Sequence, residues 1–230
     1  RPRGKIKKFE VDRERAKQAL STKGWMGVKE RRMLGDAYGM DVVPGGLAQS
    51  AEEAVAIADR VGYPVVMKLS IPSVPHKSDV GGVLLNVRDA EEVRQKFPTL
   101  MQEESEGVNV QKMVPGGREV VIGVVSDPAF GPILMFGLGG VYVEVLKDVA
   151  FAVCPVSDVR ARELVHSVRG YPILKGVRGQ EPVDEDALVE LIQLVSQMAL
   201  ENPEIAEIEF NPFLAFPDRV LGVDMRARIT

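Results

Sequence analysis

Apolar residues follow two different spacings along this chain, and the two spacings predict a mixture of helices and strands. A helical period bounded by Gly or Pro predicts helices, and short runs rich in Val, Ile and Phe between turn residues predict strands. Helices are expected at residues 12–23, 29–38, 50–61, 89–97, 158–169 and 184–200. Strands are expected at residues 64–70, 83–87, 108–114, 119–125, 133–140 and 149–156, with two more around the turn Pro217–Asp218.

The order of these elements favours an α/β or α+β fold in two parts. Pro115–Gly117 joins two β-rich stretches and is the expected break between the parts. We therefore expect an N-terminal subdomain at residues 1–113 and a C-terminal subdomain at residues 114–230.

The charge balance argues against a protein that binds nucleic acid. Lys and Arg number 29 against 33 Asp and Glu, a formal net charge of −4, whereas such binding needs a basic surface. The basic start, RPRGKIKK, is expected to be a solvated tail. The single cysteine, Cys154, excludes an internal disulfide and is expected in the core. With no apolar run long enough for a membrane span, the sequence predicts a cytoplasmic protein.

A pair of polar side chains is expected in the C-terminal hairpin. If Pro217 and Asp218 form the centre of the turn, residues at equal distances from it lie opposite each other. Asn211 then faces Asp224, unless Pro212 shifts the register by one residue. An amide oxygen beside a carboxylate suits Mg²⁺, which takes its other ligands from water and phosphate. The alternative is a polar, solvent-facing side of the hairpin.

A lysine and two glycine pairs are the next candidates. Lys68 lies in the expected strand at 64–70 among apolar residues, so its ammonium group needs either an anionic ligand or a carboxylate of the protein. The glycine pairs at 81–82 and 139–140 allow backbone N–H groups to approach an anion, but such pairs also occur in ordinary turns. Neither pair matches the P-loop pattern or the GxGxxG dinucleotide fingerprint.

The chain has two histidines. His166 lies beside the apolar stripe of its helix and is expected to be a structural or surface residue. His76 lies in the segment SVPHKSDVGG at residues 73–82. From the residues alone, His76 is either a reactive group or an ordinary loop histidine.

Several separated motifs, in the same order, resemble one known family. They are KERRMLGDAYG at 29–39, GYPVVMKLSIPSVPHKSDVGGVLLNV at 62–87, VNVQKMVPGGREVVIGVVSDPAFGPILMFGLGGVYVEVLKDVAFAVCPV at 108–156, EIEFNPFL at 207–214 and GVDMRARI at 222–229. They resemble the ATP-grasp β subunits of the ADP-forming (NDP-forming) acyl-CoA synthetases, of the archaeal acetyl-CoA synthetase type. The chain is similar, more distantly, to the ATP-grasp part of succinyl-CoA synthetase β chains. The resemblance implies an ATP-grasp fold that holds ATP or ADP with Mg²⁺ between two α+β subdomains.

The resemblance also assigns roles by position. Lys68 matches the lysine that contacts the α/β-phosphates, the strand from Gln111 to Val114 matches the adenine hinge, and Glu119 lies near the ribose. The implied cofactor-binding residues are Lys68, Ser70, Ser78, Gly81, Gly82, Val83, Gln111, Lys112, Met113, Val114, Glu119, Gly137, Gly139 and Gly140, and the implied metal ligands are Glu209, Asn211 and Asp224.

The implied reaction is acyl-CoA + ADP + phosphate ⇌ carboxylate + CoA + ATP. A partner α subunit, in a heterotetramer of two α and two β subunits, binds CoA, makes an acyl phosphate and passes the phosphoryl group to its own histidine. His76 is the implied catalytic residue, a second phosphoryl carrier beside the nucleotide, because neutral imidazole is a good nucleophile near pH 7. The alternative is that His76 only contacts phosphate or the partner.

Two other functions stay open from the sequence. One is an ATP-grasp carboxylate ligase that forms an acyl phosphate directly, without a histidine carrier. The other is a regulatory subunit that binds nucleotide without chemistry. None of the three readings calls for nucleic acid or a membrane as a partner.

Overall fold

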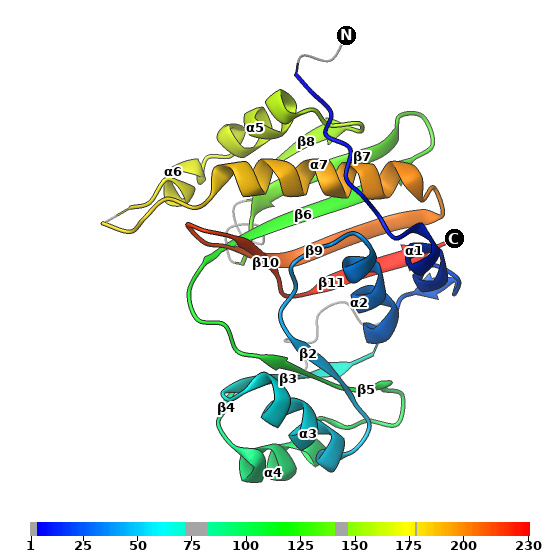
Figure 1. Ribbon diagram of the computed structural model, residues 1–230, viewed down its shortest axis with the longest axis vertical. Helices are drawn as coiled ribbons and strands as arrows, with labels where there is room; N and C mark the ends of the chain where they lie inside the picture. Colours follow the sequence, from blue (N-terminus) through cyan, green and yellow to red (C-terminus); the bar gives the residue numbers. More distant parts are fainter. Residues whose placement is uncertain (1–3, 72–81, 141–146, 178) are drawn as a thin grey trace. The chain divides into compact units, whose positions relative to one another are not determined.

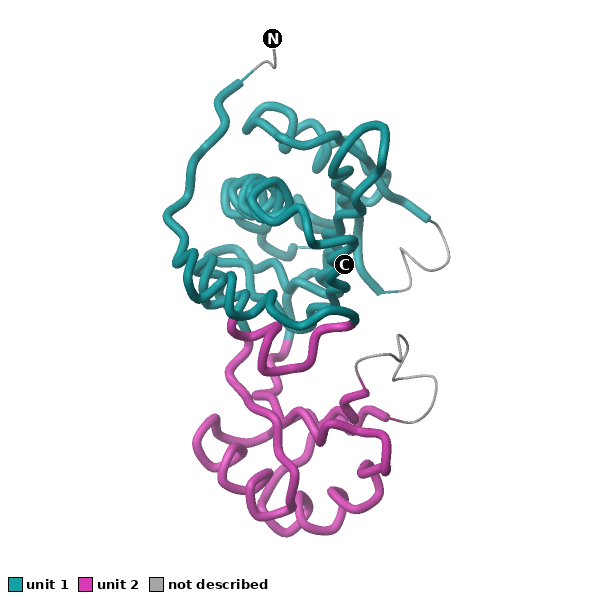
Figure 2. The backbone as a smooth tube through the Cα atoms, turned by 90° about the vertical axis from the view of Figure 1, so that its right-hand side faces the viewer, with its two compact units in different colours: residues 1–24, 34–42, 116–230 teal, residues 25–33, 43–115 magenta. Residues whose placement is uncertain are grey.

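The computed structural model describes residues 4–71, 82–140, 147–177 and 179–230, and these form two compact units (Figure 2). Unit 1 comprises residues 1–24, 34–42 and 116–230, and unit 2 comprises residues 25–33 and 43–115. Each unit is built around one sheet with helices packed against it, so the fold is α+β, as predicted.

Unit 2 is a four-stranded antiparallel sheet in the order β2–β5–β3–β4, with two helices on one face. Its elements are β2 (Gly45–Ala48), α3 (Ala51–Val61), β3 (Val65–Ser70), β4 (Val83–Val87), α4 (Ala90–Leu100) and β5 (Gly107–Lys112), and α2 (Val28–Ala37) begins in this unit. Alternate residues of β3 and β5, such as Met67 and Val110, are fully buried in the core. Ala54 and Phe97 of the helices pack into the same core.

The helix starts of unit 2 follow their sequence signals. The Ser50 hydroxyl accepts a hydrogen bond from Glu53 N at 3.2 Å, and the Asp89 carboxylate accepts one from Glu92 N at 2.8 Å. Each bond satisfies one of the N–H groups that a helix start leaves without a partner. Helix α4 does not stop at Pro98 but continues to Leu100, whose side chain is 3% exposed. Burial of this last turn outweighs the missing proline N–H.

Unit 1 is a seven-stranded sheet in the order β1–β11–β9–β6–β7–β8, with β10 paired to β9. Its elements are α1 (Arg13–Ala19), β1 (Gly24–Trp25), β6 (Arg118–Asp127), β7 (Gly131–Leu138), β8 (Val149–Val153), α5 (Asp158–Ser167), α6 (Tyr171–Leu174), α7 (Glu185–Glu201), β9 (Ile205–Ala215), β10 (Val220–Gly222) and β11 (Met225–Ile229). Helices α5 and α7 pack on the same side of the sheet (Figure 1). Ile122, Phe136 and Phe210 lie fully buried in this unit.

The division into units differs from the expected subdomains in the first 42 residues. The break between Pro115 and Gly116 does lie in the predicted loop. Residues 34–42, however, pack with unit 1, because Gly222 N donates to Asp41 O at 2.8 Å and Asn202 Nδ2 donates to the Tyr38 hydroxyl at 2.7 Å. These partners lie more than 150 residues away in the sequence, so no local pattern reveals them.

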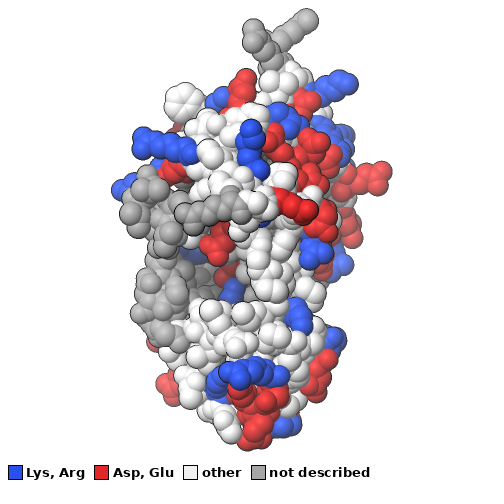
Figure 3. Space-filling view, turned by 90° about the vertical axis from the view of Figure 1, so that its left-hand side faces the viewer, with Lys and Arg blue, Asp and Glu red and all other residues white. Residues whose placement is uncertain are grey.

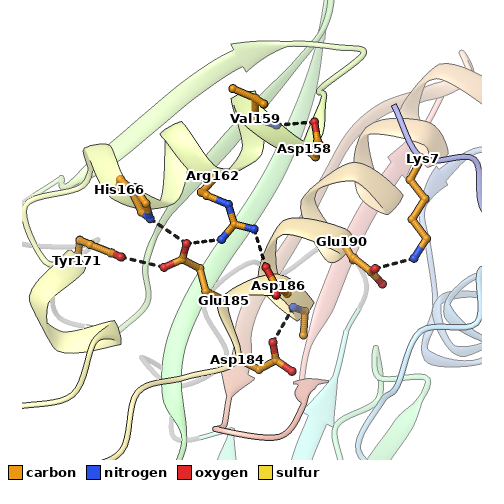
Figure 4. Close-up of polar contacts among 11 residues, drawn as sticks. Lys7, Asp158, Val159, Arg162, His166, Tyr171, Asp184, Glu185, Asp186 and Glu190 are labelled. Atoms are coloured by element: carbon orange, nitrogen blue, oxygen red, sulfur yellow. Dashed lines mark hydrogen bonds and ion pairs between the residues drawn. The ribbon is translucent and has the colours of Figure 1, made fainter. Parts of the chain in front are cut away.

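The described part of the basic N-terminus, residues 4–8, is exposed but held against the protein, unlike the free tail that its charge predicted. Residues 4–10, the N-terminal strap, lie along α7. Gln197 accepts from Phe9 N at 2.9 Å and donates to Phe9 O at 3.0 Å, as a paired strand would. Gln193 donates to Lys5 O at 2.9 Å, and Lys7 pairs with Glu190 at 2.6 Å (Figure 4). The run of basic residues does not reveal this, because the main partners of its backbone, Gln193 and Gln197 on α7 and Asp158 on α5, lie more than 150 residues away.

Replacing Gln197 by alanine is expected to release the strap. Two backbone hydrogen bonds of about 0.5–1.5 kcal/mol each are lost, so urea unfolding should report a stability loss of about 1–3 kcal/mol. Limited trypsin digestion should cut faster at Lys5 and Lys7. Gln95→Ala is the control, because Gln95 bonds only within its own helix, to Glu91. Equal digestion of the two variants would contradict the anchoring role.

The charged side chains show no separation by sign on the face drawn in Figure 3, where Lys and Arg are interspersed with Asp and Glu. Among the described residues, no helix has the length and apolar character needed to cross a bilayer.

Candidate functional site

One face of the unit 2 sheet gathers several of the predicted cofactor-binding residues. Lys68 of β3 lies opposite Val83 of β4 and Asn109 of β5, and Val66 lies opposite Gln111. Directly paired residues share a face, so these five side chains form one surface, the lysine face. The other face carries the apolar core under α3 and α4.

Asn109, which the sequence analysis did not single out, has a buried side-chain oxygen without a hydrogen-bond donor among the described residues. Its side chain is 7% exposed, and Oδ1 accepts no hydrogen bond from the described residues. A buried carbonyl oxygen without a partner costs about 1–3 kcal/mol. Its ladder neighbour Lys68 supplies a positive charge on the same face. A ligand with both N–H donors and anionic groups, as a nucleotide has, fits this pair.

Lys112, expected in the adenine hinge, uses its side chain within the protein. Its ammonium group donates to Gly62 O at 3.0 Å and Tyr63 O at 2.8 Å. Its own N–H donates to Pro44 O at 2.9 Å. The Lys112 side chain thus fixes the loop between α3 and β3, which sets the start of the strand that carries Lys68.

Ser70 and Glu106 form a partly buried contact that the sequence did not predict. The Ser70 hydroxyl, fully buried, donates to Glu106 Oε1 at 2.6 Å, and Glu106 N donates to Ser70 O at 2.9 Å. The same carboxylate accepts from Val28 N at 3.0 Å and lies 3.9 Å from an Arg31 nitrogen. Glu106 thereby ties the end of β3 to the start of α2. This contact gives the predicted cofactor-binding residue Ser70 a structural role.

Glu106→Gln is expected to loosen this connection. Hydrogen bonds to a charged acceptor contribute about 1.5–3 kcal/mol, so the free energy of unfolding should fall by about that amount in urea denaturation. Glu104→Gln is the matched control, because Glu104 is exposed two residues away. A loss no larger than that of Glu104→Gln would rule out the connecting role of Glu106.

Part of the predicted phosphate site lies outside the described residues. This holds for His76, Ser78 and Gly81. Gly82 and Val83 are described, and Leu69 N donates to Gly82 O at 2.8 Å. That bond brings the end of the glycine pair to β3, beside Lys68.

In unit 1 the predicted register of the C-terminal hairpin is confirmed. Phe216 N donates to Arg219 O across the turn, Arg226 pairs with Glu209, and Asn211 N donates to Asp224 O at 3.1 Å. Pro212 does not shift this pairing. A register shift does occur on the other side of β9, against β6, between Val120 and Ile122. The irregularity thus lies away from the polar pair.

Glu209, Asn211 and Asp224, the metal corner, lie together where β9 passes the start of β11. Asn211 Nδ2 donates to Glu209 Oε1 at 3.0 Å, which turns the amide oxygen away from that carboxylate. In the part of the chain that is described, no group of three or more His, Cys, Asp or Glu is arranged to hold a metal. The corner instead offers two carboxylates and an amide, which fits Mg²⁺ sharing its ligands with water and phosphate.

Glu119 lies against the glycines at the end of β7. Gly139 N donates to Glu119 O at 2.7 Å. A Cβ on Gly140, where φ is +60°, would lie 2.6 Å from Glu119 Oε2, and one on Gly137 would lie 2.8 Å from Asp148 O. A side chain at residue 137 would press on the backbone of Asp148, and the positive φ of Gly140 disfavours one there. The structure therefore brings together the predicted nucleotide residues of unit 1, Glu119 and the glycines.

Cys154 lies in the core, as predicted, and His166 is a surface residue in a hydrogen-bonded cluster. Cys154 is buried, which raises the pKa of its thiol. His166 is exposed on α5, and its Nε2 lies 2.8 Å from Glu185 Oε1 (Figure 4). Arg162 and Tyr171 also bond Glu185, at 2.6 and 2.8 Å. Burial raises the pKa of the Glu185 carboxyl, but the hydrogen bonds from Tyr171, His166 and Arg162 outweigh it and lower that pKa. The cluster joins α5, α6 and α7.

Comparison with known proteins identifies the family of the chain. The model of an ATP-grasp domain family matches residues 18–229. The chain is 46% identical over 197 residues to the ADP-forming acetate–CoA ligase I subunit beta of Pyrococcus furiosus, covering 82% of this chain and 85% of that protein. It is 44% identical to ADP-forming acetate–CoA ligase I of Archaeoglobus fulgidus, covering 94% of this chain and 33% of that longer protein.

Solved structures give the same result. Acetyl-coenzyme A synthetase 1 of Ca. Korarchaeum cryptofilum, in complex with coenzyme A, Ca-AMPCP and HgCl+, matches with a TM-score of 0.87 and 40% identity, covering 94% of this chain and 97% of that one. A form of that enzyme with a phosphorylated phosphohistidine segment matches with a TM-score of 0.84 and 36% identity, covering 94% of this chain and 100% of that one. The chain therefore belongs to the ATP-grasp family, in the group formed by the ADP-forming acetate–CoA ligases and their β subunits.

Proposed function

We propose that this chain is the nucleotide-binding β subunit of an ADP-forming acyl-CoA synthetase acting on acetyl-CoA. It transfers a phosphoryl group, by way of phosphohistidine, between ADP/ATP and an acyl phosphate made on an α subunit. The observation that carries the proposal is the metal corner, where a confirmed hairpin register sets Asn211 opposite Asp224 with Glu209 beside them. On unit 2, the lysine face offers the ammonium group of Lys68 to an anionic ligand.

In the ATP-forming direction, the reaction starts with acetyl-CoA on the partner subunit. On the partner, phosphate oxygen attacks the thioester carbonyl, the C–S bond breaks, and CoA leaves as the thiol. A partner histidine nitrogen then attacks phosphorus and releases the carboxylate. His76 takes the phosphoryl group from that histidine, and a β-phosphate oxygen of ADP attacks phosphorus, breaking the P–N bond and forming ATP. Each transfer leaves the donor imidazole neutral and ready for the next cycle.

The residues of this chain supply charge and position. Lys68 binds phosphate oxygens and offsets their negative charge, and Asn109 accepts from the base or from a water beside it. Glu209, Asn211 and Asp224 would hold Mg²⁺, which neutralises charge on the transferring phosphoryl group when it is bound. The partner binds CoA, and two α and two β subunits form the enzyme.

Reconstitution tests the proposal. The chain mixed with its α subunit should form ATP from acetyl-CoA, ADP and phosphate, and neither chain alone should do so. If the chain alone made acyl phosphate from acid and ATP, it would be a ligase of the direct type. If it bound ATP without supporting turnover in the mixture, it would be a regulatory subunit. Either outcome would overturn the proposal.

A further inference from the structure

The face of the unit 1 sheet that carries the metal corner is divided into a polar half and an apolar half. Register pairs across neighbouring strands run in rows over this face. One row is Arg226, Glu209, Gly123, Met135 and Phe151, and the next is Arg228, Glu207, Val125, Ile133 and Val153. Because paired residues share a face, both rows change from charged on β11 and β9 to apolar on β6, β7 and β8.

The apolar half, which we call the apolar half-face, consists of Val125, Ile133, Met135, Phe151 and Val153. Val125, Phe151 and Val153 are 56, 55 and 51% exposed, and Ile133 and Met135 are partly exposed. Contiguous exposed apolar side chains on three neighbouring strands, rimmed by charged residues, are typical of an interaction site. The intervening residues face the other way, for example Leu134 at 0% and Ala152 at 7% exposed.

A partner is expected to bind the face of this sheet rather than its edge. Strand β8 is the last in the order, so its outer backbone groups could pair with another strand. Arg160 of α5, however, donates to Phe151 O at 3.1 Å. This contact occupies the middle of the edge and disfavours extension of the sheet. A partner is therefore expected to pack on the side chains.

The relatives indicate which partner this is. Similar proteins from Pyrococcus furiosus are subunits beta, and in the Archaeoglobus fulgidus ligase the match spans 33% of a single chain. The remaining part of such an enzyme is therefore the expected occupant of this surface. A standard interface buries about 800 Å² on each partner. The five side chains of the apolar half-face supply the apolar centre of such an area. The ion pair Glu207–Arg228 lies at its rim.

The position of the apolar half-face suits a hand-over of phosphoryl groups. Glu209 and Met135 lie in one row, separated by the single strand β6. With strands about 4.8 Å apart, their backbones are about 10 Å from each other. A partner bound to the apolar half-face would therefore lie next to the metal corner. We propose that the apolar half-face is the docking surface for the CoA-binding α subunit, an inference that rests on the proposed function.

The test uses Val153→Lys in the full chain, with Val159→Lys as the matched control. Val159 is 40% exposed on α5, which covers the opposite side of the sheet. Association with the α subunit of the same ligase is measured by sedimentation velocity, and MgADP binding by calorimetry. Burying an unpaired ammonium is costly, so Val153→Lys should weaken association at least about 100-fold, while Val159→Lys associates as the wild type does. MgADP binding should stay unchanged in both variants.

Each other outcome has a definite meaning. Equal association of the two variants would overturn the docking proposal and leave the proposed function standing. Wild-type chain that does not bind the α subunit, or does not bind MgADP, would overturn the proposed function itself. Self-association of the wild type that Val153→Lys abolishes, with α binding retained, would show that a second copy of the chain covers this surface.

Discussion

His76→Ala is expected to abolish phosphoryl transfer between the nucleotide and the α subunit. Loss of a covalent carrier removes the bond-forming atom itself, and losses of this kind commonly exceed 10³-fold in turnover. MgADP binding should stay within about twofold of wild type, because the phosphate and metal contacts are made by other side chains. Turnover in the reconstituted enzyme and calorimetry of MgADP measure the two effects separately.

The second histidine supplies the control for this experiment. His166 lies in the Glu185 cluster on α5, so His166→Ala should keep both turnover and label. With ³²P-labelled ATP, acid-labile and base-stable label should appear on wild-type and His166→Ala chains, and not on His76→Ala. Label on the His76→Ala chain would show that another residue carries the phosphoryl group. Label confined to the α subunit in an active wild-type enzyme would show that His76 only guides it.

The C-terminal hairpin could be predicted in detail because its information is local. A two-residue turn fixes the register of its strands, and the alternation of Ile208, Glu209 and Phe210 fixes which side faces the core. The pairing of Asn211 with Asp224 follows from these two facts alone. The same reasoning placed Lys68 on the side of β3 opposite Met67 and Leu69.

Other contacts were not predictable because their partners are far apart or lack a local signal. Glu106 lies 36 residues from Ser70 and 78 from Val28, and nothing near it marks it as a connecting residue. Strand β2 reads GGLA, which has no strand-forming pattern, and it forms because β5 pairs with it. The N-terminal strap was misjudged for the same reason, since Gln193 and Gln197 fix it from α7.

The metal corner is the part of the proposed site that the sequence predicted from local information. Asp224→Asn in this corner is expected to weaken Mg²⁺-dependent ADP binding, the second-largest effect predicted. The substitution keeps the shape of the side chain and removes its charge, leaving Glu209 as the single carboxylate of the corner. Losing a charge-assisted contact of about 1.5–3 kcal/mol should raise the Mg²⁺ concentration for half-maximal ADP binding about 10- to 100-fold. Calorimetric titration of ADP at a series of Mg²⁺ concentrations measures this shift.

Asp218→Asn is the matched control for this shift, because it makes the same change in the exposed turn of the same hairpin. It should leave the Mg²⁺ dependence at the wild-type value. The pairing of Asn211 with Asp224 uses backbone atoms, Asn211 N and Asp224 O, so the register should survive in both variants and thermal unfolding should change little. A Mg²⁺ dependence that Asp224→Asn and Asp218→Asn share would mean that the corner is a solvent-facing polar surface. A shift confined to Asp224→Asn would instead identify it as the site where the metal joins the phosphates.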